Sequence, residues 1–257
     1  MSLVFEKKGQ IAIIRLNRPE ARNSIDPETR EGLWRAWAEV AADADIRVAI
    51  LTGTGDRAFC TGADLRKPFP APASFAEQIF TTGKPNVTDG MQMLKPIICA
   101  INGYAIGGGL ELALACDLRI ASENASFALS EAKIGSLAGS GGTQRLVRAI
   151  PQAIAMKMLL TGERIDSREA HRIGLVSDVV PLDQLMPLAM QLAERICENA
   201  PLSVRAAKLA ATRGVEMSLN DGLTLEQAFF GILRDTEDRA EGRKAFAEKR
   251  KPDYKGR

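Results

Sequence analysis

Short apolar segments alternate with segments of helical spacing from the start of the chain to about residue 180. Residues 10–16 (QIAIIRL), 47–52 (RVAILT), 97–101 (IICAI) and 117–121 are predicted strands. The run at 97–101 is continuously apolar and rich in β-branched residues, which is typical of a strand buried on both faces. Because strands and helices alternate, the pattern predicts an α/β core.

The end signals of one helix are clear. The turn signal Asn17-Arg18-Pro19 ends the first predicted strand, and Asp26 is then suited to cap a helix that begins at Pro27. Proline is tolerated at the first helical position because its missing N–H has no partner there in any case. Trp34, Trp37 and Val40 are expected to line the buried face of this helix.

From Leu182 onward the spacing of apolar residues is helical, with breaks at Ala200-Pro201 and near Gly214. We therefore predict two regions, an α/β core over residues 1–181 and a helical C-terminal region over residues 182–257. Between the predicted strands, residues 67–96 carry five prolines and few apolar runs. This segment is expected to be a mobile loop or a helix-loop that helps to shape a substrate pocket.

The bulk composition sets limits on the possible partners. The 257 residues carry a net charge of +2, so the chain lacks the concentrated basic surface that nucleic-acid binding normally requires. No run approaches the length of about 18 apolar residues that a membrane span needs, and residues 1–9 contain no apolar signal-peptide core. We therefore expect a cytoplasmic enzyme with no nucleic-acid and no membrane partner.

Cysteine and histidine residues form no pattern of a metal centre. The four cysteines lack a CxxC pair, so reduced, buried thiols are favoured over disulfides; they are Cys60, Cys99, Cys116 and Cys197. The only histidine, His171, lies in a charged helical stretch and is interpreted as a surface residue. A histidine-rich zinc site is excluded and a Ser-His-Asp triad would depend on His171, so we predict no metal requirement.

Two glycine-rich turns carry the candidate chemistry. The first, at residues 53–65, leads into Thr61-Gly62-Ala63-Asp64 and can aim backbone N–H groups at an anion or a polarised oxygen. A plain turn between strand and helix remains the alternative. The second turn, Gly107-Gly108-Gly109, precedes a helix predicted from Leu110 to about Ala115. Three glycines leave the backbone open to a ligand at a helix start, where the dipole favours negative charge.

Two glutamates follow the second turn. Glu111 lies on the first turn of the predicted helix among apolar neighbours, and Glu131 comes directly after the apolar stretch 126–130. A desolvated carboxyl group has a raised pKa and is useful as an acid. Spacing alone leaves open a dipole-stabilising role for Glu111 and an exposed position for Glu131. The triple glycine is no GxGxxG fingerprint, so a Rossmann oxidoreductase is disfavoured.

Together these segments resemble the crotonase (enoyl-CoA hydratase/isomerase) superfamily. The matching strings occur in order and at family-like spacing: AFCTGADL (58–65), AINGYAIGGGLELALACDLRIAS (100–122), FALSEAKIG (127–135), GGTQRLVRAI (141–150) and AFAEKRKPDYKGR (245–257). The resemblance implies an α/β fold built as a spiral of ββα turns. It also implies a homotrimer or dimer of trimers, in which the helical C-terminal region covers the active site of its own or a neighbouring subunit.

The resemblance also implies an activity, the reversible addition of water to a trans-2-enoyl-CoA to give a 3-hydroxyacyl-CoA. The thioester carbonyl would lie between the backbone N–H groups of Ala63 and Gly108, an oxyanion hole that stabilises an enolate-like oxygen. Glu111 would activate the water that attacks Cβ, and Glu131 would supply the proton to Cα. The coenzyme A thioester is the substrate, and no further cofactor is expected.

Residues around the first turn would hold coenzyme A. By the resemblance, the adenine lies against Gly62, Ala63, Asp64 and Leu65, and Arg66 lies near the phosphates. Phe230 would close over the pantetheine or acyl chain, and Lys249 would reach the coenzyme A bound by a neighbouring subunit. For Arg66 and Lys249, a position as solvated surface residues is an equally good explanation.

This sequence departs from the family pattern at two positions. Glu20 occupies a place where lysine is common, which removes one proposed basic contact, and Ser130 replaces a proline that commonly precedes the second glutamate. Within the superfamily, a carnitinyl-CoA dehydratase, an isomerase or an acyl-CoA hydrolase are the alternatives. A non-catalytic binding protein of the same fold is disfavoured by the near-neutral charge and the two retained glutamates.

Overall fold

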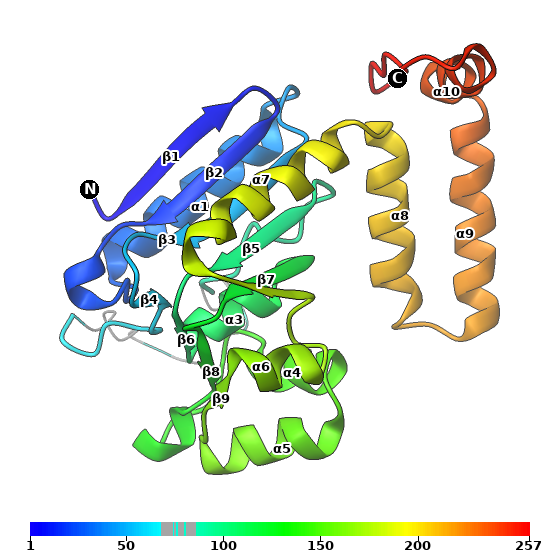
Figure 1. The fold of residues 1–257 in the computed structure, drawn as a ribbon. Helices are drawn as coiled ribbons and strands as arrows, with labels where there is room; N and C mark the ends of the chain where they lie inside the picture. The colour runs from blue at the N-terminus through cyan, green and yellow to red at the C-terminus, as the bar shows by residue number, and fades with distance from the viewer. Residues whose placement is uncertain (68–73, 75, 77–79, 81–85) are drawn as a thin grey trace.

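The computed structural model describes residues 1–67, 74, 76, 80 and 86–257 (Figure 1). In this described part the larger sheet has six strands in the order β1-β2-β3-β5-β7-β10. Its strands are β1 (Leu3–Lys8), β2 (Ile11–Leu16), β3 (Val48–Gly53), β5 (Ile97–Ile101), β7 (Leu118–Ser122) and β10 (Asp178–Val180). β1 is antiparallel to β2, whereas the neighbours from β2 to β10 are parallel.

A smaller sheet in the described residues has the order β4-β6-β8-β9. Its strands are β4 (Ala58–Cys60), β6 (Tyr104–Ile106), β8 (Ser126–Ala128) and β9 (Ile165–Asp166). β3, β5 and β7 of the larger sheet are each followed along the chain by a strand of the smaller one, which is the ββα repeat that the resemblance implies. Because β4 pairs in parallel with β6, the segments that leave these two strands lie next to each other.

Helices cover both faces of the larger sheet (Figure 1). On one face, Trp37 of α1 (Pro27–Ala42) belongs to a buried cluster that includes Ile14 and Leu51, and α3 (Gly108–Leu114) lies on the same side. On the other face, α7 (Leu182–Cys197) packs against alternate residues of the same strands. Side chains alternate between the faces of a strand, so continuously apolar strands supply both layers of the core.

Among the described residues, η1 (Pro19–Ala21) lies between β2 and α1 along the chain. One end of the core carries η3 (Glu131–Ile134), α4 (Gly142–Ala149), α5 (Gln152–Thr161) and α6 (Ser167–Arg172) (Figure 1). The C-terminal part of the chain contains α8 (Pro201–Gly214), α9 (Leu219–Arg234) and α10 (Glu237–Glu248). Residues 201–257, here called the arm, stand beside the core, with α8 and α9 side by side and α10 across their end (Figure 1). The predicted division of the chain into two regions after residue 181 stays a prediction. α7, which follows that position, packs on the larger sheet.

Most predicted elements are confirmed, with two corrections. Asp26 caps α1, since its side chain accepts a hydrogen bond from the Thr29 N–H at 2.9 Å. Trp34 is only half-buried, and its indole N–H donates to the carbonyl of Asn86 at 3.0 Å. The pattern did not predict β1, an edge strand that ends in the exposed residues Lys7 and Lys8.

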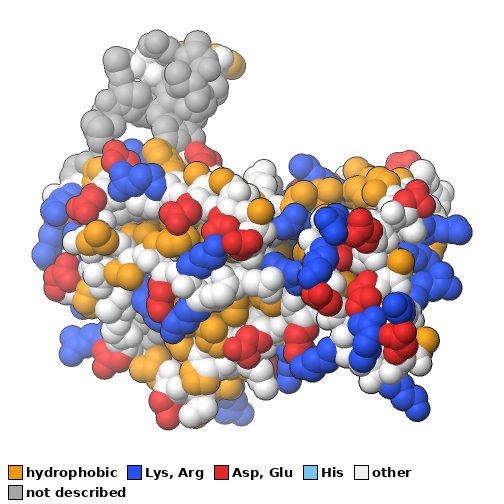
Figure 2. Space-filling view, turned by 90° about the horizontal axis from the view of Figure 1, so that it is seen from above, with side chains coloured by type: hydrophobic (Ala, Val, Ile, Leu, Met, Phe, Trp, Pro, Cys, Tyr) orange, Lys and Arg blue, Asp and Glu red, His pale blue; other side chains and the backbone are white. Residues whose placement is uncertain are grey.

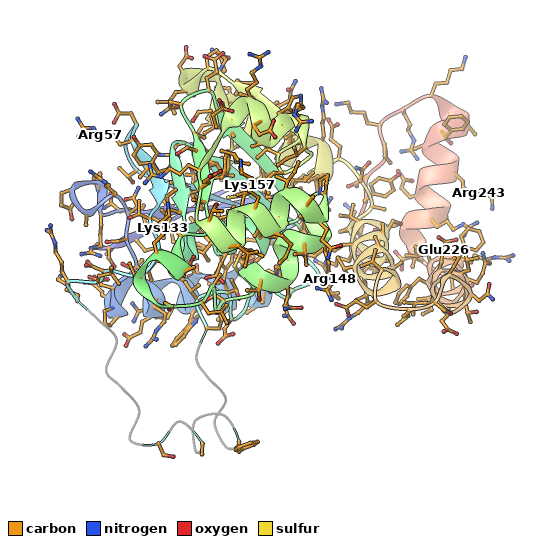
Figure 3. The ribbon with its side chains drawn as sticks, turned by 90° about the horizontal axis from the view of Figure 1, so that it is seen from below. Arg57, Lys133, Arg148, Lys157, Glu226 and Arg243 are labelled. Carbon is orange, nitrogen blue, oxygen red and sulfur yellow. The ribbon has the colours of Figure 1, made fainter. Side chains whose placement is uncertain are left out.

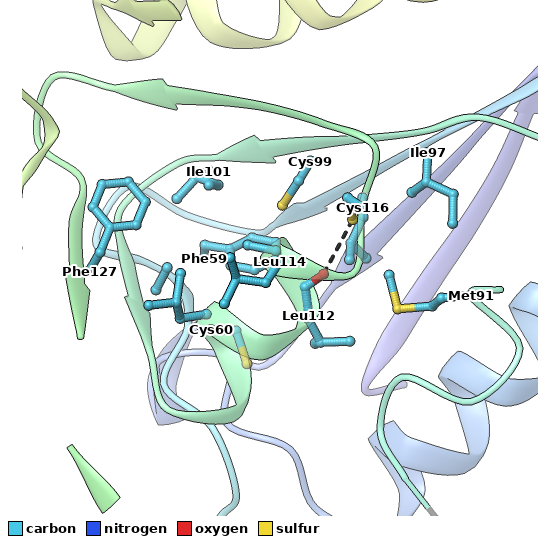
Figure 4. Packing of buried hydrophobic residues seen from close by; sticks show 14 of the residues in the cluster. Phe59, Cys60, Met91, Ile97, Cys99, Ile101, Leu112, Leu114, Cys116 and Phe127 are labelled. Carbon is cyan, nitrogen blue, oxygen red and sulfur yellow. Dashed lines mark hydrogen bonds between the residues drawn. The ribbon is translucent and has the colours of Figure 1, made fainter. Parts of the chain in front are cut away.

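The cysteines are free thiols, and three of the four are buried as predicted (Figure 4). Cys116 donates from its thiol to the carbonyl of Leu112, and burial raises the pKa of Cys60 to about 12. His171 is exposed, as predicted. None of the helices in the described residues has the length and apolar character needed to cross a membrane.

Candidate active site

The two glycine-rich turns meet where β4 and β6 end. Gly62 has a φ of +83°, and a Cβ atom placed on it would lie 2.9 Å from the Gly108 nitrogen. A Cβ atom on Gly108 would in turn lie 3.9 Å from the Ala63 nitrogen. The approach of the two backbones therefore requires glycine at position 62, where the positive φ also disfavours any other residue.

The N–H groups of Ala63 and Gly108 are oriented away from the main-chain pairing around them. Ile25 and Ala63 form a parallel bridge in which Ile25 N–H donates to Gly62 and Asp64 N–H donates to Ile25. The Ala63 N–H consequently points to the opposite side, and Gly108 is the first residue of α3, where helices leave N–H groups unpaired. Neither N–H donates a hydrogen bond to another residue in the described part of the chain.

Glu111 is held by the loop that precedes α4. The residue is only 3% exposed, and Oε1 accepts hydrogen bonds from the N–H groups of Ser140 at 2.6 Å and Gly142 at 2.8 Å. A Cβ atom on Gly142 would lie 3.0 Å from the same oxygen, so this position also needs glycine. Two N–H donors on one oxygen favour the ionised carboxylate.

Glu131 lies on the other side of the glycine triplet, at the start of η3. A Cβ atom on Gly107 would lie 3.0 Å from Oε1 of Glu131, and Oε2 is buried without a hydrogen-bond partner among the described residues. Burial raises the pKa of Glu131, and the negative charge of Glu111 raises it further. The structure thus brings Glu111, Glu131 and the two N–H groups of the predicted oxyanion hole together.

The residues predicted to hold coenzyme A fall into two groups. Gly62, Ala63, Asp64, Leu65 and Arg66 form one continuous loop beside the predicted oxyanion hole, and Leu65 is 72% exposed. The Asp64 side chain is buried against Arg18, which holds the pKa of this carboxyl below its usual range. Asp64 can therefore contact a ligand through its backbone, while the side chain serves the loop itself.

Phe230 and Lys249 are on the arm, away from α3 of the same chain. Figure 1 shows α9 and α10 beside the core, and in Figure 3 Glu226 and Arg243 of the arm lie well apart from Lys133 and Lys157. Phe230 lies in α9 under the guanidinium of Arg239, 4.9 Å from the ring centre. A single chain does not bring these two residues to the glutamates, and their predicted contacts with coenzyme A stay predictions.

A polar hollow of about 270 Å³ lies next to the loop that binds Glu111. Its lining consists of Asn86, Thr88, Asp89, Gly90, Gln92, Ser140, Gly141 and Arg145. Part of the predicted pocket segment 67–96 borders it, but most of residues 68–85 lie outside the described residues. Ser140, Gly142 and Arg18 were not predicted as site residues, although the glycines of 139–142 are a signal for a tight backbone contact.

Known proteins resemble this chain over nearly all of its length. Residues 6–257 match the family described as enoyl-CoA hydratase/isomerase. The chain belongs to this family. A crystal structure of an enoyl-CoA hydratase from Bacillus anthracis superposes with a TM-score of 0.91 at 38% identity, covering 100% of both chains. Among curated relatives, an (E)-benzylidenesuccinyl-CoA hydratase from Thauera aromatica is 55% identical over 100% of both chains. A 2,3-dehydroadipyl-CoA hydratase from Escherichia coli is 41% identical over 99% of both.

These similarities confirm the predicted superfamily and its α/β spiral fold. They also confirm the predicted activity: the chain is an enoyl-CoA hydratase, which is a hydro-lyase acting on an acyl-CoA. In the described residues no three histidine, cysteine, aspartate or glutamate side chains are grouped as metal ligands. The residue roles at the site remain predictions.

Proposed function

We propose that Glu111 and Glu131 carry out the hydration, with the thioester oxygen bound by the N–H groups of Ala63 and Gly108. Attack of water on Cβ of an enoyl-CoA moves negative charge onto the thioester oxygen. A preorganised N–H donor at such an oxygen is worth about 3–4 kcal/mol in comparable sites. The observation that carries the proposal is the closeness of these two unpaired N–H groups to the buried carboxyl group of Glu111 and the half-buried one of Glu131.

The environments of the two glutamates suit opposite roles. The N–H groups of Ser140 and Gly142 favour the negative charge of Glu111, which is the form needed to take a proton from the attacking water. Burial favours the neutral form of Glu131, which is the form needed to protonate Cα. Removal of water in the reverse direction uses the same two groups with their roles exchanged.

Loss of the conjugated thioester absorbance of crotonyl-CoA tests this assignment. Glu111→Gln and Glu131→Gln should each lower kcat by about 10²–10⁴ while the protein stays folded and binds coenzyme A. The exposed residue Glu31 on α1 offers a matched control, and Glu31→Gln should keep the wild-type rate. Wild-type rates in either of the two site variants would contradict the proposal.

The natural acyl group is proposed to carry a second polar group, such as a carboxylate. Both curated relatives described above are named for thioesters of dicarboxylic acids, benzylidenesuccinate and dehydroadipate. The polar lining of the hollow beside Glu111, which includes Asn86, Gln92 and Arg145, also favours a polar substituent over a plain alkyl chain.

A substrate panel separates these possibilities. The ratio kcat/KM should be higher for (E)-benzylidenesuccinyl-CoA or 2,3-dehydroadipyl-CoA than for crotonyl-CoA or carnitinyl-CoA. Gln92→Leu, at an exposed position of the hollow, should lower kcat/KM for the dicarboxylic thioester by about 3–10-fold, equivalent to one hydrogen bond, and leave crotonyl-CoA unaffected. A preference for crotonyl-CoA would refute the carboxylate, and a preference for carnitinyl-CoA would identify the dehydratase alternative.

The assembly is proposed to be a homotrimer or a dimer of trimers that forms through the arm. Large apolar side chains are exposed there, and part of this surface is visible in Figure 2; they include Val215, Leu219, Leu223, Phe230 and Ile232. Such apolar area on a helical arm is typical of a subunit interface. Light scattering should give the mass of three or six chains, and Leu219→Glu should shift the mass toward one chain. A monomeric wild-type protein would contradict the proposal.

A further inference from the structure

The guanidinium group of Arg18 joins two chain segments beside the predicted oxyanion hole. Its Nη2 donates to the Asp64 carboxylate at 2.7 Å, and its Nη1 donates to the carbonyl of Ser24 at 2.7 Å. Arg18 follows β2, Ser24 precedes α1, and Asp64 follows Ala63 in the loop after β4. One planar group therefore fixes the segment between β2 and α1 relative to the loop after β4.

The partners of Arg18 lie on either side of the bridge that orients Ala63. Ser24 comes before Ile25, and Asp64 comes after Ala63, while Ile25 and Ala63 form the bridge itself. The bridge consists of two hydrogen bonds, at 2.8 and 2.9 Å, and runs over a single residue pair. A bridge over one residue pair has few hydrogen bonds to fix its position. Arg18 adds two hydrogen bonds to the residues that flank the bridge.

Burial and charge make this contact specific. The side chains of Arg18 and Asp64 are 12% and 8% exposed, and Asp26 lies 3.4 Å from the same guanidinium. The second oxygen of Asp64 accepts the N–H of Arg66 at 3.0 Å, so the pair also shapes the loop predicted to bind coenzyme A. Lysine has the charge of arginine but lacks the two planar, parallel N–H donors of the guanidinium, so it does not reproduce the geometry of the two hydrogen bonds.

Resting on the proposed function, we propose that Arg18 is a positioning residue of the hydratase. It holds the Ala63 N–H against the thioester oxygen by clamping Asp64 to the Ser24 carbonyl. The rival explanation is a buried ion pair that only stabilises the fold, as such networks often do. The two explanations differ in their effect on the polarisation of the bound thioester, because stability alone does not change the position of the N–H group.

The test uses a chromophoric enoyl-CoA, 4-(dimethylamino)cinnamoyl-CoA, whose absorbance moves to longer wavelength when its thioester carbonyl is polarised. Arg18→Lys, Arg18→Met and Asp64→Asn are each expected to reduce this shift and to lower kcat for crotonyl-CoA by about 10–100-fold, typical of supporting residues around a site. KM should change less than kcat, and lysine should retain more activity than methionine.

Controls keep the outcome interpretable. Arg57→Met removes the same charge from an exposed residue just before β4 and should leave both the spectral shift and kcat unchanged. If Arg18→Met fails to fold, the double variant Arg18→Met/Asp64→Leu removes both members of the pair, and Asp26 keeps the N–H of Thr29 and the ammonium of Lys67 as partners. A variant with lower thermal stability but a full spectral shift and full kcat overturns the positioning role. A wild-type protein that binds the probe without any shift would instead refute the proposed oxyanion hole.

Discussion

Replacing Gly62 by alanine tests the close approach of the two glycine turns. The backbone at this position has a φ of +83°, and the added Cβ would lie 2.9 Å from the Gly108 nitrogen and 3.1 Å from the Ile106 carbonyl oxygen. Both neighbours are backbone atoms, so the strain cannot be relieved by turning a side chain. Either the loop at Gly62 or the start of α3 has to move.

The expected loss in the free energy of unfolding has two parts, and a variant at a second glycine measures one part alone. A left-handed backbone costs a residue other than glycine about 1–2 kcal/mol, and overpacking typically adds about 1–3 kcal/mol. Gly174 has a φ of +78°, and a Cβ atom added there would meet nothing within 4 Å beyond its chain neighbours, so Gly174→Ala should show the first part alone. Gly62→Ala should therefore destabilise the protein by about 2–5 kcal/mol in total.

Chemical denaturation followed by circular dichroism, at one protein concentration, measures the free energy of unfolding of both variants. Hydration of crotonyl-CoA then shows the second effect of the displaced backbone. A displaced donor should lower kcat for Gly62→Ala by up to about 10²–10³, the loss seen when one such donor is removed, while Gly174→Ala keeps the wild-type rate. Equal losses of stability in the two variants, together with full activity in both, would contradict the close contact between the two turns.

The other predictions concern the glutamates and the start of α1. Burial raises the pKa of Glu131, so the contribution of this group to stability is lost as the pH rises through that raised pKa. Glu131→Gln should therefore be more stable than wild type above this pH and not below it. Thermal melts across the pH range should show no such difference if Glu131 is solvated. For the same reason the wild-type hydration rate should fall as the pH rises through the pKa of Glu131, and a flat pH–rate profile there would argue against its role as the acid. Gly142→Ala places a Cβ 3.0 Å from Oε1 of Glu111 and 2.8 Å from the Ala138 Cβ. This variant should lower the free energy of unfolding in denaturant by about 1–3 kcal/mol and should also lower kcat. Unchanged values of both would show that the loop can move aside. Asp26→Ala removes the cap of α1 and should cost about 1–2 kcal/mol by the same unfolding measurement, with a neutral result contradicting the cap.

The strands and the first helix were predictable because their signals are local. The continuous apolar runs that became β2, β3 and β5 are set by the need to bury both faces of a parallel sheet, and Asp26-Pro27 is a complete helix start within two residues. β1 was missed because an edge strand needs no apolar pattern on its exposed side. The glycine turns were identified, since three adjacent glycines before a helix leave few other interpretations.

The residue pattern along the chain predicted most of the elements, the family and the types of residue available for chemistry. The contacts between distant segments come from the three-dimensional fold: Gly62 touches Gly108, the loop at 140–142 binds Glu111, and Arg18 clamps Asp64. These contacts join segments separated by tens of residues, and nothing in the spacing along the chain encodes a distance across two sheets. Arg18 in particular follows a strand at a turn signal, where an arginine is most often solvated. The fold buries its guanidinium against two carboxylates, because the bridge between Ile25 and Ala63 brings their segments to it.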